Sequence, residues 1–280
     1  MLVNFMIIGA QKCGTTTLAE QLASHEQICF CAIKEPGYFH ATPDWQAKLA
    51  DYHQLYTPKA GQICGEASTM YTFLPEWLDT HVRLHAYNPD LKLIYIMRHP
   101  VERVISNYAH RLVRHTVKQT PEEAVFADIN YINRSRYGVQ IRPYLELFPR
   151  ENVLLLIFEE YIVNQAKTLQ QIADFLAIAP DGFHLHGAEP RVTHRSVGEH
   201  YWGPMMQTVR DTPIVAQALT YLPQALRTDV RRRFGTKLEQ KPEFSPALRK
   251  TIWRFVEDDV STIEGLLGRR LDCWRQGYSE

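Results

Sequence analysis

Residues 5–17 read FMIIGAQKCGTTT, an apolar run that leads through a glycine-bounded loop into three threonines. The run Phe5–Ile8 contains no polar residue, which is typical of a strand buried on both faces of a parallel sheet. After the loop, Leu18 and Leu22 are four positions apart, the spacing of one face of a helix. The stretch therefore predicts a strand, a loop from Gly9 to Gly14 and a helix, in that order.

Similar alternations of apolar runs and helical patterns continue along the chain. We expect strands at Ile28–Ala32, Leu91–Met97 and Val153–Phe158, and helices at Thr15–Ser24, Val101–Arg114 and Ala166–Leu176. Ser245 and Pro246 are typical of a helix start, and that helix would run to about Leu267 and end at Gly268. The predicted fold class is α/β, with a P-loop-like central parallel sheet flanked by helices and a helical C-terminal part. No linker divides the chain, so we expect residues 1–280 to form a single domain.

The composition excludes several classes of protein. Of the 280 residues, 45% are hydrophobic and 22% charged, which excludes a disordered chain. With 31 basic and 31 acidic residues the net charge is zero, so no nucleic-acid partner is expected, although a local basic pocket remains open. The longest apolar run, residues 153–158, is too short for a membrane span. The N-terminus lacks the pattern of a signal peptide.

Cysteine and histidine spacings favour neither disulfides nor a metal site. The five cysteines are odd in number and irregularly spaced, so the simplest interpretation is a reducing, cytoplasmic setting. Three close pairs lack the third ligand that a metal site needs: Cys29 with Cys31, His81 with His85, and His184 with His186. We therefore expect no metal and buried free thiols.

The loop between Gly9 and Gly14 has the composition of a phosphate-binding loop. Backbone N–H groups and the positive end of the following helix can hold a phosphate, while Lys12 adds charge and residues 15–17 add hydroxyl groups. The alternative is an ordinary strand–helix turn. In the nucleoside-triphosphatase P-loop a lysine follows the second glycine, but here Thr15 does. A loop for a single 5′-phosphate group therefore fits better than one for ATP and Mg²⁺.

Two motifs resemble those of the sulfotransferases that use 3′-phosphoadenosine 5′-phosphosulfate (PAPS), in particular the carbohydrate and heparan sulfate type, here as a bacterial-type soluble member. Residues 11–18, QKCGTTTL, resemble the loop that binds the 5′-phosphosulfate, and residues 98–108, RHPVERVISNY, resemble the 3′-phosphate motif. The resemblance also includes residues 135–148 and 266–274 and is weakest over 205–245. It implies the cofactor-binding residues Lys12, Cys13, Gly14, Thr15, Thr16, Thr17, Arg98 and Ser106.

The same resemblance implies a catalytic base. Residues 34–39, KEPGYF, are similar to a family segment in which a glutamate takes the proton of the acceptor hydroxyl, which corresponds to Glu35. Lys12 would stabilise charge on the leaving phosphate, with Lys34 a weaker candidate. The alternative is that Glu35 is an ordinary loop carboxylate that pairs with Lys34. The possible proton carriers His40, His99 and His110 more simply have structural roles.

Two further segments depart from the family pattern or match it loosely. Residues 66–71 read EASTMY, so Ala67 replaces the lysine that relatives of the heparan 3-O type carry, while Ser68 and Tyr71 either line the site or serve the fold. Residues 189–198 are a basic, glycine-containing segment in the region where the family closes over the nucleotide. Its candidates for contacting the nucleotide are Arg191, Arg195 and Ser196.

The sequence thus predicts a sulfotransferase that moves the sulfuryl group from PAPS to a hydroxyl or amine by in-line displacement and releases adenosine 3′,5′-bisphosphate, with no metal. The acceptor stays open among a small molecule, a sugar, a lipid and a carrier-bound intermediate, and the oligomeric state is not predicted. Two alternatives are a P-loop kinase that uses ATP and Mg²⁺ and a nucleotide-binding module without catalysis.

Overall fold

A computed structural model describes residues 2–114, 116–183, 200–201 and 236–278. Contacts between Cα atoms divide the chain into two compact units. The first comprises Met1–Arg103, Asn133–His194 and Trp253–Glu280, and the second comprises Val104–Ile132 and Arg195–Ile252. The expectation of one domain over residues 1–280 stays a prediction.

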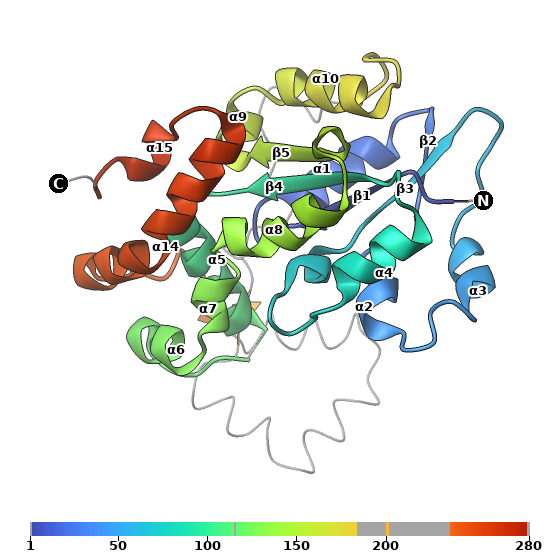
Figure 1. Ribbon diagram of the computed structural model, residues 1–280. Coiled ribbons are helices and arrows are strands. Elements are labelled where there is room, and N and C mark those ends of the chain that lie inside the picture. The colour runs from blue at the N-terminus through green and yellow to red at the C-terminus, as the bar shows by residue number, and fades with distance from the viewer. Residues whose placement is uncertain (1, 115, 184–199, 202–235, 279–280) are drawn as a thin grey trace, which may run out of the picture. The chain divides into compact units, whose positions relative to one another are not determined.

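A five-stranded parallel sheet forms the centre of the first unit (Figure 1). Its spatial order is β2-β3-β1-β4-β5. The strands are β1 (Phe5–Gly9), β2 (Ile28–Phe30), β3 (Ile63–Ala67), β4 (Lys92–Met97) and β5 (Val153–Ile157). Every residue of β1 is buried, as expected for a central parallel strand. The α/β class with a parallel sheet is therefore confirmed.

Helices and short helical turns connect the strands. The helices of the first unit up to residue 183 are α1 (Thr15–Ala23), α2 (Tyr38–Ala41), α3 (Leu49–His53), α4 (Thr80–Tyr87), α8 (Tyr137–Leu147), α9 (Phe158–Val163) and α10 (Gln165–Leu176), with 3₁₀ turns η1 (Thr69–Thr72) and η2 (Arg150–Asn152). Figure 1 shows α10 on one side of the sheet and α4 and α8 on the other. The sheet is thus covered on both faces, which explains why its strands read as continuous apolar runs.

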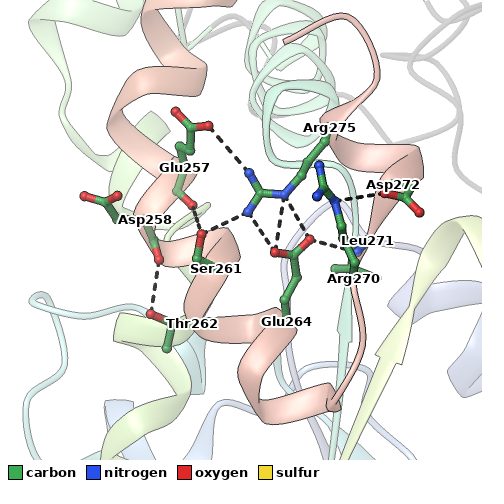
Figure 2. A network of polar contacts seen from close by, with 9 residues as sticks. All are labelled: Glu257, Asp258, Ser261, Thr262, Glu264, Arg270, Leu271, Asp272 and Arg275. Atoms are coloured by element: carbon green, nitrogen blue, oxygen red, sulfur yellow. Dashed lines mark hydrogen bonds and ion pairs between the residues drawn. The ribbon is translucent and has the colours of Figure 1, made fainter. Parts of the chain in front are cut away.

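The C-terminal part is helical, as the sequence predicts. The long helix α14 (Pro246–Leu267) ends before Gly268, whose φ of 65° suits glycine, and a short helix α15 (Asp272–Arg275) follows. Figure 2 shows Arg275 of α15 bonded to α14: its guanidinium lies 2.7 Å from the Glu264 carboxylate, 3.5 Å from that of Glu257, and donates to Ser261 Oγ at 2.9 Å. These bonds fold the end of the chain back onto α14.

The second unit contains most of α5 (Pro100–Val113), α6 (Pro121–Ala127), most of α7 (Asn130–Asn133) and the first turns of α14. Its strands β6 (His200–Tyr201) and β7 (Thr236–Lys237) pair antiparallel. A capping box starts α6: Thr120 Oγ1 accepts the Glu123 N–H, and the Glu123 carboxylate accepts the Thr120 N–H. Arg111 and Asp128 form an ion pair at 2.6 Å.

Two details of the sheet differ from the sequence-based expectation. Strand β3 was not predicted, because its sequence ICGEA contains a glycine and a glutamate. The glycine is required: a Cβ at Gly65 would lie 2.1 Å from the ring of Phe5 on the neighbouring strand. Phe158, expected to end a strand, instead begins α9. The other predicted elements are confirmed to within two residues at each end. The predicted start of α14 is among them, because Pro246 is its first residue and Ser245 Oγ accepts the Leu248 N–H.

Candidate functional site

The Gly9–Gly14 loop joins β1 to α1 and leaves the start of the helix without a side-chain cap. Gly14 is the N-cap residue, with φ 85°, and neither a capping side chain nor an acidic residue occupies the first turn. The N–H groups of this turn carry the positive end of the helix dipole. A Cβ at Gly14 would lie 2.7 Å from the ring of Phe158, so only glycine fits. The loop therefore has the geometry of an anion-binding helix start.

The other residues predicted for this loop differ in exposure. Cys13 is buried, and burial raises the pKa of its thiol to about 11, so the thiol stays neutral at pH 7. Its N–H donates within the loop to the Ala10 carbonyl. Lys12, with φ 70°, and Thr16 are half-buried, whereas Thr15 and Thr17 are buried. Cys13 thus serves packing through its side chain, and its neighbours remain candidates for the ligand.

Arg98 lies one residue beyond β4, the strand that pairs with β1. Its guanidinium carbon is 5.0 Å from the centroid of the Phe158 ring, and its NH2 group is 3.8 Å from the Glu102 carboxylate. Because the Gly14 backbone also approaches Phe158, one aromatic ring lies against both predicted phosphate-binding motifs. The two motifs, more than eighty residues apart in sequence, meet at one edge of the sheet.

A tyrosine joins the same two motifs from α8. The Tyr137 hydroxyl donates to the Arg98 carbonyl at 2.6 Å and lies 3.7 Å from the Cys13 sulfur. Tyr137 is fully buried. It fixes the backbone next to Arg98 against the phosphate loop.

Glu159 accepts a hydrogen bond from His99, the residue that follows Arg98. Its Oε1 accepts the His99 N–H at 2.9 Å, and its Oε2 accepts the indole N–H of Trp274 at 2.9 Å. Trp274 is buried and belongs to α15. The C-terminal segment, one of those that resemble the family, therefore supports the end of β4.

The segment with Glu35 contacts α1 next to the phosphate loop. Lys34 Nζ donates to Thr16 Oγ1 at 2.7 Å, so this lysine bonds to α1. Glu35 itself is exposed and has a left-handed backbone with φ 53°. The structure thus brings the predicted base segment to the first turn of α1.

Two of the three candidate histidines are buried among aromatic rings. His40 is buried between the rings of Tyr71 and Trp77, and burial lowers its pKa, as does Arg83. The buried ring of His99 contacts Trp253 and Tyr278. His110 is half-buried on the part of α5 in the second unit. The contacts of His40 and His99 favour structural roles.

The remaining predicted cofactor-binding residues lie in the second unit or outside the described residues. Ser106 is half-buried on α5 and belongs to the second unit. Arg191, Arg195 and Ser196 lie outside the described residues, as do His184 and His186.

Sequence reasoning missed Phe158 and Glu159. The start of α9 places Phe158 against Arg98 and Glu159 on the His99 N–H, and no motif signalled either residue. Tyr137 was signalled only as part of residues 135–148, and the Lys34–Thr16 bond by no pattern at all.

Four of the five cysteines are buried free thiols, and Cys273 is exposed. Within the described ranges, no group of three or more His, Cys, Asp or Glu side chains is arranged to hold a metal ion. None of the helices described combines the length and apolar character needed to cross a membrane.

Comparison with known proteins places the chain in a family. The sulfotransferase domain family model matches residues 3–197, more than half of the chain, so the chain belongs to the sulfotransferase domain family. It is 27% identical over 249 residues to carbohydrate sulfotransferase 15 of Mus musculus, a match that covers 64% of this chain and 44% of that protein. It is 27% identical over 261 residues to heparan sulfate glucosamine 3-O-sulfotransferase 6 of Homo sapiens, covering 82% of this chain and 70% of that protein.

The fold has a solved counterpart. The crystal structure of a sulfotransferase from Alicyclobacillus acidocaldarius superimposes with a TM-score of 0.71 at 23% identity, covering 99% of this chain and all of that one. At this identity the likeness concerns the fold. The chain spans less than half the length of several relatives that it matches, including heparan sulfate glucosamine 3-O-sulfotransferase 3B1 of Mus musculus.

Proposed function

We propose that this protein transfers the sulfuryl group of PAPS to an acceptor hydroxyl or amine. Family membership supports the class of reaction. The observation that carries the assignment to this edge of the sheet is the meeting of the β1–α1 loop and Arg98 around Phe158. A donor with phosphate groups at both its 5′ and 3′ positions suits a site with two separate anion-binding elements.

The start of α1 fits the 5′ end of the donor. Its first-turn N–H groups have no capping side chain, and no acidic residue there would repel an anion. Gly14 and residues 15–17 would bind this end through N–H groups and hydroxyls, with Lys12 and Cys13 completing the loop. A lysine charge near the bridging oxygen stabilises negative charge as the phosphate leaves, which is the role proposed for Lys12.

Arg98 is proposed to hold the 3′-phosphate, with Ser106 as a second ligand. A guanidinium forms paired hydrogen bonds with a phosphate monoester, a group that ATP lacks at this position. The 3.8 Å contact with Glu102 is longer than a good charge-assisted hydrogen bond, so the Arg98 side chain keeps donors for a phosphate. Arg191, Arg195 and Ser196 stay candidates for further contacts.

Glu35 is proposed as the base. The acceptor oxygen attacks sulfur and its proton passes to the Glu35 carboxylate, while the bond between sulfur and the 5′-phosphate oxygen breaks and the electron pair leaves with the phosphate. The exposure of Glu35 leaves it open to an acceptor from solution. Lys34, bonded to Thr16, holds this segment beside the phosphate loop.

Calorimetry tests the nucleotide assignment. We expect adenosine 3′,5′-bisphosphate to bind without metal and more tightly than ATP with Mg²⁺. Equal or tighter binding of ATP with Mg²⁺ would favour the kinase alternative and contradict the proposal.

Transfer assays test catalysis and begin to identify the acceptor. ³⁵S-labelled PAPS would be offered with a heparan sulfate oligosaccharide, glucosamine and 1-dodecanol, which represent glycan, sugar and lipid acceptors. We expect transfer to at least one of them and its loss in Glu35→Gln. Tight binding of the bisphosphate, with no transfer and no effect of Glu35→Gln, would favour a non-catalytic binding module.

A further inference from the structure

A buried carboxylate lies at the end of β3, beneath the segment that carries Glu35. Glu66 is fully buried, and its Oε2 accepts hydrogen bonds from the hydroxyls of Tyr52 at 2.7 Å and Tyr56 at 3.3 Å. A buried carboxylate is costly unless hydrogen bonds compensate for the lost water. Glu66 is the residue before the last one of β3, and the tyrosine hydroxyls supply this compensation.

Two hydroxyls just after Glu66 bond to the backbone of the Glu35 segment. Ser68 Oγ accepts the Gly37 N–H at 3.1 Å, and the Tyr71 hydroxyl accepts the Phe39 N–H at 3.5 Å, the longer and weaker of the two bonds. Ser68 and Tyr71 are both buried. These bonds fix the turn at Gly37, two residues after Glu35, from the side of the sheet.

The Gly37 turn has little freedom to move. Its φ is 60°, and a Cβ there would lie 2.4 Å from the His40 ring. Lys34 holds the other end of the segment through Thr16 Oγ1. Glu35 therefore lies between two anchors, one on α1 and one on the residues that follow β3.

Ser68 and Tyr71 follow the buried Glu66 closely in the chain. Because both side chains are buried, their hydroxyls have little freedom to move away from the Gly37 and Phe39 N–H groups that they accept.

We propose that Ser68 and Tyr71 are positioning residues that hold the Glu35 segment for catalysis through their hydrogen bonds to the Gly37 and Phe39 N–H groups. The proposal rests on the proposed function, in which Glu35 is the base. It assigns the two residues to the site rather than to the fold alone.

Hydrogen exchange measured by mass spectrometry tests the positioning without any acceptor. In Ser68→Ala and Tyr71→Phe we expect amides of residues 34–39 to exchange at least about 10-fold faster, with exchange in β1 and β4 unchanged. The matched control is Tyr56→Phe. It removes a buried hydroxyl that bonds to the Glu66 carboxylate, but it breaks no hydrogen bond to residues 34–39. Unchanged exchange at 34–39 in both variants, or an equal increase in the control, would overturn the proposal.

Kinetics then test the link to Glu35, with the best acceptor of the three offered above. We expect kcat to fall about 10-fold in Tyr71→Phe, with KM for PAPS within about twofold, because misplacing a catalytic group costs rate rather than donor binding. Combining Tyr71→Phe with Glu35→Gln should cause no further loss in kcat beyond Glu35→Gln alone. Fully additive losses would overturn the proposal.

The Glu35→Gln single variant separates the two hypotheses. Full activity in this variant would remove the base from the proposed function and with it the role of the anchors. A strong loss in Glu35→Gln together with wild-type kcat and exchange in Tyr71→Phe and Ser68→Ala would leave the proposed function intact and overturn only the positioning.

Discussion

Gly14 is the residue at which the β1–α1 loop becomes a helix, and its environment leaves no room for a side chain. Its φ is 85°, and a Cβ added at this position would lie 2.7 Å from the Phe158 ring. Both features disfavour any residue other than glycine. A glycine here lets the ring that also contacts Arg98 pack directly on the loop backbone. Local conformation and the meeting of the two motifs therefore depend on one position.

Gly14→Ala tests this coupling. We expect it to lower the free energy of unfolding by about 1–3 kcal/mol through backbone strain and the clash, and to weaken binding of adenosine 3′,5′-bisphosphate. Chemical denaturation and calorimetry measure the two effects. Gly265→Ala, in open space within α14, is the control and should raise stability by about 0.5–1 kcal/mol.

Arg98→Ala tests the 3′-phosphate assignment. Losing charge-assisted hydrogen bonds of about 1.5–3 kcal/mol should weaken binding of adenosine 3′,5′-bisphosphate about 10- to 150-fold and change that of adenosine 5′-phosphate far less. Titration calorimetry with both nucleotides gives the comparison, and Arg269→Ala, which removes a surface ion pair with Glu160, is the control. Equal weakening of both nucleotides would refute the assignment.

At the scale of elements, the start of α8 depends on a carboxylate from α14. Asp259 is buried, and its two carboxylate oxygens accept the N–H groups of Gly138 and Val139 at 2.8 and 2.9 Å. Helix α8 also carries Tyr137, which joins Arg98 to the phosphate loop. The packing of the C-terminal helix thus bears on the site through one capping interaction.

Asp259→Ala leaves two N–H groups at the start of a buried helix without their partner. We expect the free energy of unfolding to fall by about 1–3 kcal/mol, measured by urea denaturation. Asp258→Ala changes the same residue type on the exposed side of α14 and should stay within about 0.5 kcal/mol of wild type. Similar losses in the free energy of unfolding in both variants would show that the hydrogen bonds of Asp259 to α8 do not contribute to stability.

Strand β3 and the end of β5 show why some elements escaped prediction. The sequence ICGEA of β3 lacks an apolar run because it contains Gly65 and Glu66. Gly65 leaves room for the Phe5 ring, and tyrosine hydroxyls from another segment compensate for the burial of the Glu66 carboxylate. Both reasons are tertiary contacts of β3, one with the neighbouring strand β1 and one with tyrosines in and just after α3, and the periodicity of the sequence does not contain such contacts. β1, β4 and β5 were predictable because a strand covered on both faces must be apolar throughout.

At the scale of the whole molecule, the buried Glu66 gives stability a pH dependence. Burial raises its pKa in the folded protein above the ordinary value of 4.5, despite opposing hydrogen bonds. Between these two pKa values the folded state binds more protons than the unfolded state, so stability falls as the pH rises. The contribution is fully present below about pH 4.5 and is lost as the pH passes the raised value.

Glu66→Gln removes this dependence. We expect the stability of the wild type relative to Glu66→Gln to decline with rising pH above about 4.5, by at most about 1.4 kcal/mol per pH unit. Denaturation curves collected from pH 4 to pH 8 measure it, with the exposed Glu26→Gln as the control for loss of one charge. Parallel profiles for wild type and Glu66→Gln would contradict the expectation.

The sequence by itself determined the α/β class and the family, and it predicts the phosphate-type loop and the second basic motif, because each is carried by short contiguous segments of the chain. The tertiary structure decided which residues meet: Phe158 between Gly14 and Arg98, Lys34 on Thr16, and the Ser68 and Tyr71 hydroxyls on the Glu35 segment. These contacts join parts of the chain that are 18 to about 144 positions apart, brought together because neighbouring parallel strands end at the same edge of the sheet.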